Sequence, residues 1–269
     1  MGRSTRQFCR KRGFLIYPMI TKKQTHWYQK HQISLYEVDN FNKIRLDSVF
    51  DYLQEAASNN AELLGWGYND LIKDELTWVL SRVILDLKVY KGVGEIIEVD
   101  TWPKGIDGIL ALRDYRLYDA NENIIGLATS AWLLVNSKTM RPVKNDIFDL
   151  RVQKINPDSE NAIEDTPGKI LIPEKTEFAY ERKIKYSDID VNHHVNNAKY
   201  VQFILDCFEM NEFSGKEIRN IQINFLSELK YGDNVVINKG KADDEGMNIY
   251  VEGIKNNGKK VFQSLVKWQ

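Results

Sequence analysis

Apolar and polar residues alternate with a period of two along most of the chain, and helical periodicity interrupts this pattern twice. The first helical pattern consists of Leu46, Val49, Phe50, Leu53 and Ala57. Ser48 and Asp51 have the spacing of a capping box at its start, and Gly65 is suited to its end. The second helical pattern, from about Asn196 to Met210, is apolar around most of its circumference, which is typical of a buried helix.

The alternating segments predict two similar sets of strands around these helices. In the first set, one extended segment precedes the helix and four strands follow it: Gln32–Val38, then 83–89, Glu95–Trp102, Leu110–Tyr118 and Ile124–Val135. The second set repeats this order: Glu181–Tyr186, then Arg219–Leu229, Asn234–Gly240, Met247–Lys255 and Lys260–Trp268. One helix for four or five strands does not fit a doubly wound parallel sheet, which needs a helix at nearly every crossover.

We therefore expect an α+β protein in which each half is a curved antiparallel sheet wrapped around one long buried helix. This is a tandem, or double, hotdog fold; two unrelated α+β domains are the alternative. Residues 1–30 form a basic tail, 31–144 the N-terminal hotdog, 145–177 a proline-containing linker and 178–269 the C-terminal hotdog.

The composition of the 269 residues is that of a globular protein, with 43% hydrophobic residues and no run long enough to span a membrane. Residues 1–30 carry eight basic side chains and no acidic one, so the remainder has 29 basic and 38 acidic side chains, a net charge of -9. This balance argues against a nucleic-acid binder. The basic start precedes an apolar stretch, Phe14–Ile20, which is the order found in a secretory signal. A disordered tail, or a sequence extended upstream of a true start at Met19, fits better. Two cysteines, Cys9 and Cys207, suit a reducing cytoplasm.

The densest polar cluster lies in residues 187–197, directly before the second helix. Asp190, Asn192 and His194 are spaced two residues apart, so in an extended loop they point the same way and His193 points oppositely. A helix N-terminus can also stabilise an oxyanion. The alternative is that Asn196 or another polar residue only caps the helix. Adjacent histidines without a further ligand do not indicate a metal site.

A second candidate is Glu228, near the end of a predicted strand and between apolar residues. When the two halves are aligned at Gly94 and Gly232, Tyr90 lies opposite Glu228. The counterpart of the polar cluster is Asn40–Arg45, which contains no histidine. Because only the second half has these polar residues, we expect the chemistry there and the shaping of the substrate site in the first half.

The segment Asp190–Tyr200 matches the pattern D-x-N-x-H-V-N-N-x-K-Y at every specified position, and through it the chain resembles the acyl-acyl carrier protein thioesterases of plant plastids and bacteria. Supporting matches cover Leu53–Ala57, Trp78–Arg82, Glu98–Trp102 and Arg113–Tyr115, and the resemblance extends over roughly residues 30–269. It implies a double hotdog that hydrolyses fatty acyl-carrier-protein thioesters without a cofactor.

By this resemblance, the functional residues are Asp190, Asn192, His194 and Glu228. Plant members commonly have a cysteine after the glutamate, where this chain has Leu229, so a Cys-His covalent mechanism does not suit it. We expect Glu228 to face the 190–194 cluster across a gap that admits water and the thioester. Glu228 would then activate the water, although Asp190 could exchange roles with it, and backbone N–H groups near Val195 and Asn196 would hold the oxyanion.

Trp66 and Trp78 are the candidates for an apolar slot that receives the acyl chain, although both are also typical of plain core. The expected partner is an acidic acyl carrier protein, bound through a local basic patch at Lys138, Arg141 and Lys144, or at 182–185. A monomer or a homodimer, in a bacterial cytoplasm, fits a tandem hotdog. Three alternatives stay open: an acyl-CoA thioesterase, a non-catalytic acyl-binding module and, against the Asn-x-His-Val-Asn-Asn motif, a hotdog dehydratase.

Overall fold

The structure is a computed structural model that describes residues 25–143 and 161–269. The strands of the first half are β1 (Trp27–Gln32), β2 (Leu76–Leu87), β3 (Ile96–Asp107), β4 (Leu110–Tyr118) and β5 (Ile124–Asn136). Those of the second half are β6 (Glu177–Lys183), β7 (Ile218–Phe225), β8 (Asn234–Lys241), β9 (Asn248–Lys255) and β10 (Lys260–Trp268). The helices are α2 (Leu46–Leu63), α3 (Tyr68–Leu71) and α5 (Asn197–Leu205), with short 3-10 turns η1 (Leu35–Glu37), η2 (Ile72–Asp74), η3 (Tyr186–Asp188) and η4 (Met210–Phe213).

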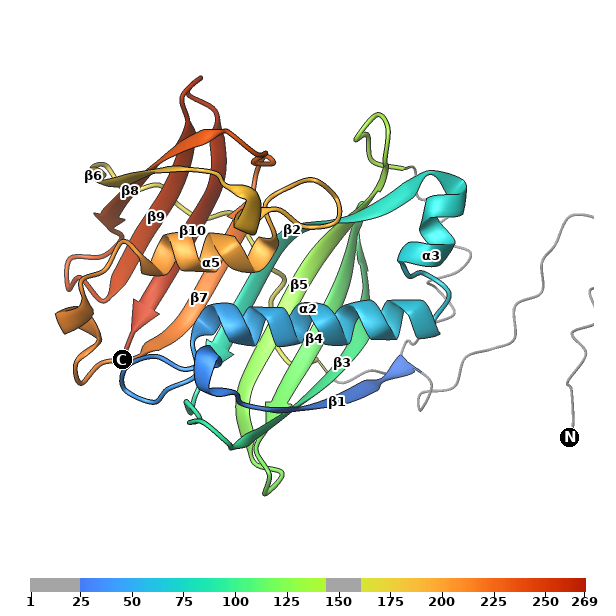
Figure 1. Ribbon diagram of the computed structural model, residues 1–269, viewed down its shortest axis with the longest axis horizontal. Helices are drawn as coiled ribbons and strands as arrows, with labels where there is room; N and C mark the ends of the chain where they lie inside the picture. Colours follow the sequence, from blue (N-terminus) through green and yellow to red (C-terminus); the bar gives the residue numbers. More distant parts are fainter. Residues whose placement is uncertain (1–24, 144–160) are drawn as a thin grey trace, which may run out of the picture.

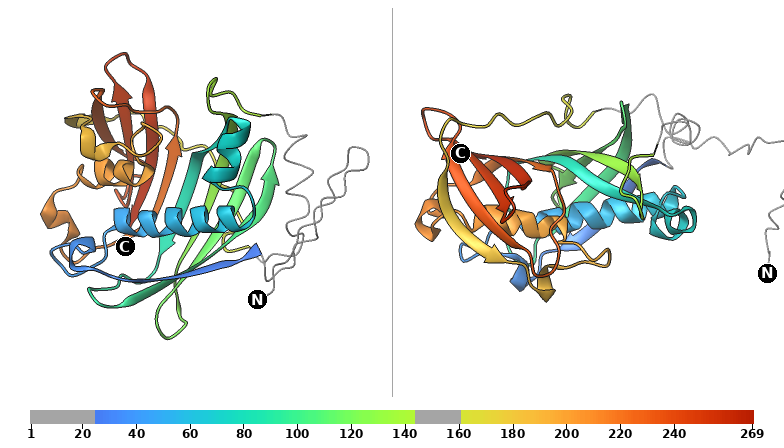
Figure 2. Two further views of the ribbon diagram at one scale, coloured as in Figure 1. Left: turned by 45° about the vertical axis from the view of Figure 1, so that its right-hand side comes forward. Right: turned by 90° about the horizontal axis from the view of Figure 1, so that it is seen from above.

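All the strands join one antiparallel sheet in the order β1-β3-β4-β5-β2-β7-β10-β9-β8-β6. Each half thus orders its five strands in the same way, and the two halves meet where β2 pairs with β7. Figure 1 shows α2 and α5 lying on the same face of this sheet, and Figure 2 shows the sheet curving around both helices. This is the tandem hotdog expected from the strand pattern.

The core is the layer between the helices and the concave face of the sheet. Strand residues of both halves are completely buried there, among them Val99, Leu117, Ile221 and Ile237. The all-apolar pattern of the second helix has the predicted cause, because Val201, Phe203 and Ile204 are fully buried. Burying such side chains is the main favourable term in folding, at about 1.5–3 kcal/mol each.

Several predicted element boundaries differ from the structure. β1 begins at Trp27, before the expected boundary at residue 31, and the expected extended segment 32–38 contains the turn η1 instead. The proposed capping box at Ser48 is wrong, because α2 begins earlier, with Arg45 at the N-cap and no side-chain cap hydrogen bond. The expected strand 219–229 ends at Phe225 and the second helix ends at Leu205.

The linker is described from residue 161 onward, where it crosses the face of the sheet opposite the helices (Figure 2). Arg82 donates to the carbonyl of Pro167 at 2.8 Å, and Gln222 and Asn224 both donate to the carbonyl of Gly168 at 2.8 and 3.0 Å. These bonds link the segment to both halves on either side of the β2–β7 boundary. Of the expected tail at 1–30, residues 1–24 with Cys9 lie outside the described residues, as do the linker residues 145–160, whereas 27–30 belong to β1.

Gly65 ends α2 as the sequence predicts. Its φ is +77°, and the N–H groups of Gly65 and Trp66 return to the carbonyls of Glu62 and Ala61. This is the Schellman pattern, which satisfies helix carbonyls that have no partner within the helix. The chain then turns back over the sheet and carries Trp66 to its place beside β2.

We expect Gly65→Ala to lower the free energy of unfolding by about 1–2 kcal/mol, because an L-residue is strained at this positive φ. Chemical denaturation monitored by circular dichroism measures the change. Gly168→Ala is the matched control, since its Cβ would meet nothing within 4 Å and its φ is not positive. Equal stability of Gly65→Ala and wild type would contradict the assignment.

Candidate active site

The candidate site lies in a cleft where the sheet divides. β2 and β7 pair only from Arg82–Asn224 to Asp86–Asn220, and the rest of β2, Leu76–Ser81, continues beside β5 alone. A cavity of about 600 Å³ occupies this opening. Asp190, Asn192, His194 and Glu228 all line it, and His193 does not. The four residues predicted from the sequence therefore come together, from two loops that are distant in the chain.

The loop before α5 is a tight turn built around Asp190. The Oδ1 atom of Asp190 accepts the N–H groups of Asn192 at 2.8 Å and of His194 at 3.4 Å. The N–H of Asp190 donates to the carbonyl of His194 at 2.8 Å, and His193 adopts a φ of +64°. The loop is thus turned rather than extended. Asp190 holds its main chain and places the side chains of Asn192 and His194 at the cleft.

His194 and Glu228 are in direct contact, with 2.9 Å between Nε2 and Oε2. Their side chains are 25% and 31% exposed, so both are accessible from the cleft. The expectation that a gap for water separates them is wrong. The imidazole competes with water for Oε2, so Oε1 is the oxygen better suited to accept a proton from a water in the cleft.

Glu228 follows β7 in a loop that Tyr200 holds in place. The Tyr200 hydroxyl accepts the N–H of Leu229 at 3.2 Å, and burial raises the pKa of this phenol above its ordinary value. The hydroxyl is therefore neutral at physiological pH, while Leu229 is fully buried. The sequence motif contains Tyr200, but its role in holding the loop at Leu229 could not be predicted, because the contact depends on the fold.

The expectation that the N–H groups of Val195 and Asn196 hold the oxyanion is wrong, because both already have carbonyl acceptors. The N–H of Val195 donates to the carbonyl of Leu229 at 2.9 Å, and that of Asn196 donates to Asp188 at 3.0 Å. Asn196 is instead the N-cap of α5, and its side chain accepts the N–H of Ala198 at 2.8 Å. Asn197 is the first residue of α5 and borders the cleft, and an N–H at this position has no acceptor within its own helix.

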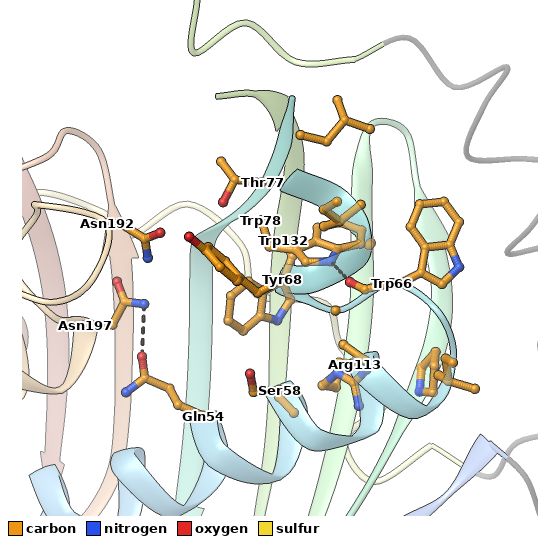
Figure 3. Close-up of a pocket in the computed structure, with 18 of the residues that line it drawn as sticks. Gln54, Ser58, Trp66, Tyr68, Thr77, Trp78, Arg113, Trp132, Asn192 and Asn197 are labelled. Carbon is orange, nitrogen blue, oxygen red and sulfur yellow. Dashed lines mark hydrogen bonds between the residues drawn. The ribbon is translucent and has the colours of Figure 1, made fainter. Parts of the chain in front are cut away.

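A second cavity, of about 330 Å³, adjoins the cleft and extends between α2 and the first half of the sheet. Trp66 and Trp78 line it, with ring centroids 6.1 Å apart, and the Trp78 indole N–H donates to the carbonyl of Trp66 at 3.0 Å. Figure 3 shows Trp132 of β5 beside them, with Asn192 and Asn197 at the opposite side. Both predicted tryptophans thus border an apolar pocket. Trp132 was missed because nothing in its alternating strand marks it as a pocket residue.

Cys207 belongs to the core. It is 7% exposed, and its thiol donates to the carbonyl of Phe203 at 3.6 Å. Burial raises the pKa of this thiol to about 12. It is therefore protonated at neutral pH and is not available as a nucleophile.

The first half contains a loop with the same backbone as the loop at 190–194. Asp39 accepts the N–H groups of Phe41 and Lys43 at 2.9 Å each, and Asn42 has a φ of +58°. The N–H of Ile44 donates to the carbonyl of Lys91, as that of Val195 does to Leu229. The alignment of the halves at Gly94 and Gly232 is therefore confirmed.

The side chains of this second loop carry different chemistry. Lys43 stands where His194 does and binds Glu217 at 2.6 Å. Tyr90 stands where Glu228 does, and its hydroxyl donates to the carbonyl of Ile218 at 2.8 Å. Both contacts run from the first half to the start of β7, so this side of the molecule joins the halves instead of offering a histidine and a carboxylate.

The region equivalent to the tryptophan-lined pocket contains clustered aromatic rings, and a cavity of about 580 Å³ beside the second loop reaches Phe208 and Phe213. Trp132 pairs with Leu80, and Trp268 pairs with Ile218, which is the equivalent position of β7. Phe208 and Phe213 pack edge-on against Trp268, with centroids 5.1 and 5.2 Å away. The His194–Glu228 pair thus lies on one side of the molecule, beside the tryptophan-lined pocket.

Two further findings concern residues 25–143 and 161–269 only. No three His, Cys, Asp or Glu side chains gather there as a metal site. None of the helices in these ranges is long and apolar enough to cross a membrane.

The fold and the cleft together define a tandem hotdog protein with one polar site at the junction of its halves. The family model for the acyl-ACP thioesterase N-terminal domain matches residues 24–150, and that for the C-terminal domain matches residues 172–269. The chain belongs to the acyl-ACP thioesterase family.

Comparisons with individual proteins point to the same family. The chain is 29% identical over 215 residues to a chloroplastic palmitoyl-acyl carrier protein thioesterase of Cuphea hookeriana, with 74% of this chain and 51% of that protein covered. It thus spans about half the length of the curated relatives it matches. A solved acyl-ACP thioesterase structure from Bacteroides thetaiotaomicron is 25% identical, covers 93% of this chain and 100% of its own, and has a TM-score of 0.83. The 12:0-ACP thioesterase of Umbellularia californica has the same fold, with a TM-score of 0.78, 20% identity and coverage of 95% and 99%.

Proposed function

We propose that this protein hydrolyses the thioester of a fatty acyl-acyl carrier protein, releases the free fatty acid and thereby ends chain elongation. One observation carries the proposal: the His194–Glu228 contact opens onto a cleft that adjoins a tryptophan-lined pocket. The pocket suits an acyl chain and the cleft suits the thioester. The names of the relatives supply the substrate class.

In the mechanism that this geometry supports, Glu228 is the general base. Its Oε2 is held by His194, and Oε1 takes a proton from water as the water oxygen bonds to the thioester carbonyl carbon. The carbonyl oxygen then bears the negative charge, and the Asn192 amide and the Asn197 N–H at the start of α5 are the candidate donors to it. Collapse of this tetrahedral intermediate breaks the carbon–sulfur bond, and the proton on Glu228 passes to the departing sulfur.

The second loop argues that Asp190 is not the base. Asp39 makes the same two main-chain hydrogen bonds in a loop that has neither the histidine nor the glutamate. The carboxylate at this position is thus accounted for by turn geometry alone. An asparagine side chain can accept the same bonds, because its carbonyl oxygen replaces Oδ1.

The base assignment predicts that Glu228→Gln and His194→Ala each lower hydrolysis of a long acyl-carrier thioester by about 10²–10⁴-fold. Asp190→Asn lowers it by less than about tenfold, because the turn persists. Chromatography of released fatty acid measures the rates, and circular dichroism verifies folding. Cys207→Ala is the control expected to keep its activity. A near-normal rate for Glu228→Gln, or a greater loss for Asp190→Asn, would contradict the assignment.

The tryptophan-lined pocket is proposed to set chain-length preference, because Trp78 borders both the pocket and the cleft. Trp78→Ala enlarges the space, so the ratio of kcat/KM values for a longer and a shorter saturated chain is expected to rise by about tenfold or more. Competition between two acyl-carrier substrates measures this ratio. Tyr36→Ala, which removes an exposed aromatic ring of the same half, is the control. An unchanged ratio in folded Trp78→Ala would make Trp78 ordinary core.

The carrier protein is proposed to dock at the mouth of the cleft. Ser137 and Met140 from one half and Lys259 from the other border this cavity. Arg141 and Lys259 are exposed, and no ion pair among the described residues uses either. Lys138 is paired with Glu75, and Lys144 lies outside the described residues. In the alternative basic patch at 182–185, Arg182 already forms an ion pair with Asp188 at 2.5 Å.

The double variant Arg141→Glu with Lys259→Glu is expected to lower kcat/KM for acyl-carrier substrate by about tenfold or more at low salt, because docking loses charge attraction. Turnover of the same acyl group on N-acetylcysteamine is expected to be unchanged. Lys183→Glu with Lys185→Glu is the matched control for net charge. Equal losses on both substrates, or in both double variants, would reject this docking surface, and faster turnover of an acyl-CoA of the same length would favour a CoA thioesterase.

We also propose a bacterial cytoplasm as the compartment and a monomer or homodimer as the assembly. Cys207 is a free, buried thiol, which suits a reducing compartment. The β2–β7 pairing already joins two hotdog halves within one chain. A second copy is therefore not needed to complete the site.

A further inference from the structure

Gln54, on α2 of the first half, reaches the start of the helix that carries the candidate site. Its Nε2 lies 3.3 Å from Oδ1 of Asn196 and donates to it. Its Oε1 accepts from Nδ2 of Asn197 at 3.1 Å, the bond drawn between these two residues in Figure 3. One amide side chain of the half without chemistry thus holds two consecutive asparagines of the other half.

Both asparagines bear on the N-terminus of α5. The Oδ1 atom of Asn196 also accepts the N–H of Ala198, so the amide that caps the helix is itself fixed by Gln54. Asn197 borders the cleft and the pocket, and its main-chain N–H is the candidate oxyanion donor. Gln54 lines the pocket but is not among the residues that line the cleft with His194 and Glu228.

We propose that Gln54 is a positioning residue for the hydrolysis, holding Asn196 and Asn197 so that the first N–H of α5 faces the thioester carbonyl. The inference rests on the proposed function. Displacing a donor by even a fraction of its hydrogen-bond length weakens the stabilisation of developing charge, and a misplacement of about 1 Å can cost about 10²-fold.

The second loop supports this role by lacking the whole arrangement. Ile44 and Val195 are equivalent, so Gln54 corresponds to Leu205, ten residues further along in each half. Arg45 and Leu46 stand where Asn196 and Asn197 do. The trio of amides therefore occurs on the side with the His194–Glu228 pair, and the other side has two leucines and an arginine in its place.

A contact of similar kind provides a matched control. Gln202 of α5 donates to Oδ2 of Asp47 of α2 at 2.6 Å, which is also a hydrogen bond between the helices of the two halves. Gln202 borders the cavity of the second loop and neither cavity of the candidate site. Losing either glutamine removes helix-to-helix hydrogen bonding, but only Gln54 supports α5 at the cleft.

The experiment compares Gln54→Met with Gln202→Met in steady-state hydrolysis of one acyl-carrier thioester. We expect Gln54→Met to lower kcat by about 10–100-fold, with KM within about twofold of wild type. Gln202→Met is expected to keep kcat within about twofold. Thermal unfolding of both variants reports the stability lost with the hydrogen bonds.

Gln54→Glu adds a readout that a structural role would not move. A protonated glutamic acid can donate and accept as glutamine does, whereas the carboxylate only accepts. Its kcat relative to wild type is therefore expected to be higher at pH 5 than at pH 8. A flat ratio, or a kcat for Gln54→Met equal to that for Gln202→Met, would overturn the inference. If His194→Ala stays fully active the proposed function itself fails, whereas an inactive His194→Ala beside a fully active Gln54→Met defeats only the role of Gln54.

Discussion

The antiparallel pairing of β2 with β7 is the constraint on which the rest of the structure depends. It joins the two halves into one sheet over the pairs from Arg82–Asn224 to Asp86–Asn220, and it stops there. A register shift between Leu80 and Arg82 marks the end of the shared pairing, and a bulge of this kind bends a strand and reverses which face its side chains take. Leu80 and Trp78 accordingly turn to the helix side, and the cleft opens beside them.

The architecture could be predicted from the sequence because each half has two distinct patterns. Its strands alternate apolar and polar residues, and its buried helix has a helical apolar pattern. β4 and β10 have the predicted bounds for this reason. The sequence was not sufficient where tertiary contacts set the ends. η1 lies inside an apparently extended segment because Glu37 bonds back to the N–H of Ser34 at 2.7 Å, which alternation cannot encode.

The same distinction applies to the site. Residues two apart in one short loop were predictable as a group, and Glu228 was predictable as a candidate from its position near the end of a strand, between apolar residues. Their distances were not predictable, since the contact of His194 with Glu228 depends on how the loop after β7 is held by Tyr200. Gln54 has no local signal at all, because a glutamine on a helix is ordinary until another helix is placed against it.

The two loops of the chain separate what the backbone needs from what the proposed chemistry needs. A carboxylate that accepts two N–H groups and a residue at positive φ occur in both loops, so they belong to the turn. The imidazole, the glutamate and the amide trio occur on one side of the molecule only, next to the tryptophan-lined pocket. On the other side, Lys43 and Tyr90 reach across to the start of β7, and Phe208 packs edge-on against Trp268 beside the cavity of the second loop. A second site would weaken this packing, since each buried aromatic removed from it would cost about 3–5 kcal/mol. Stability on one side and access on the other are therefore two uses of the same duplicated fold.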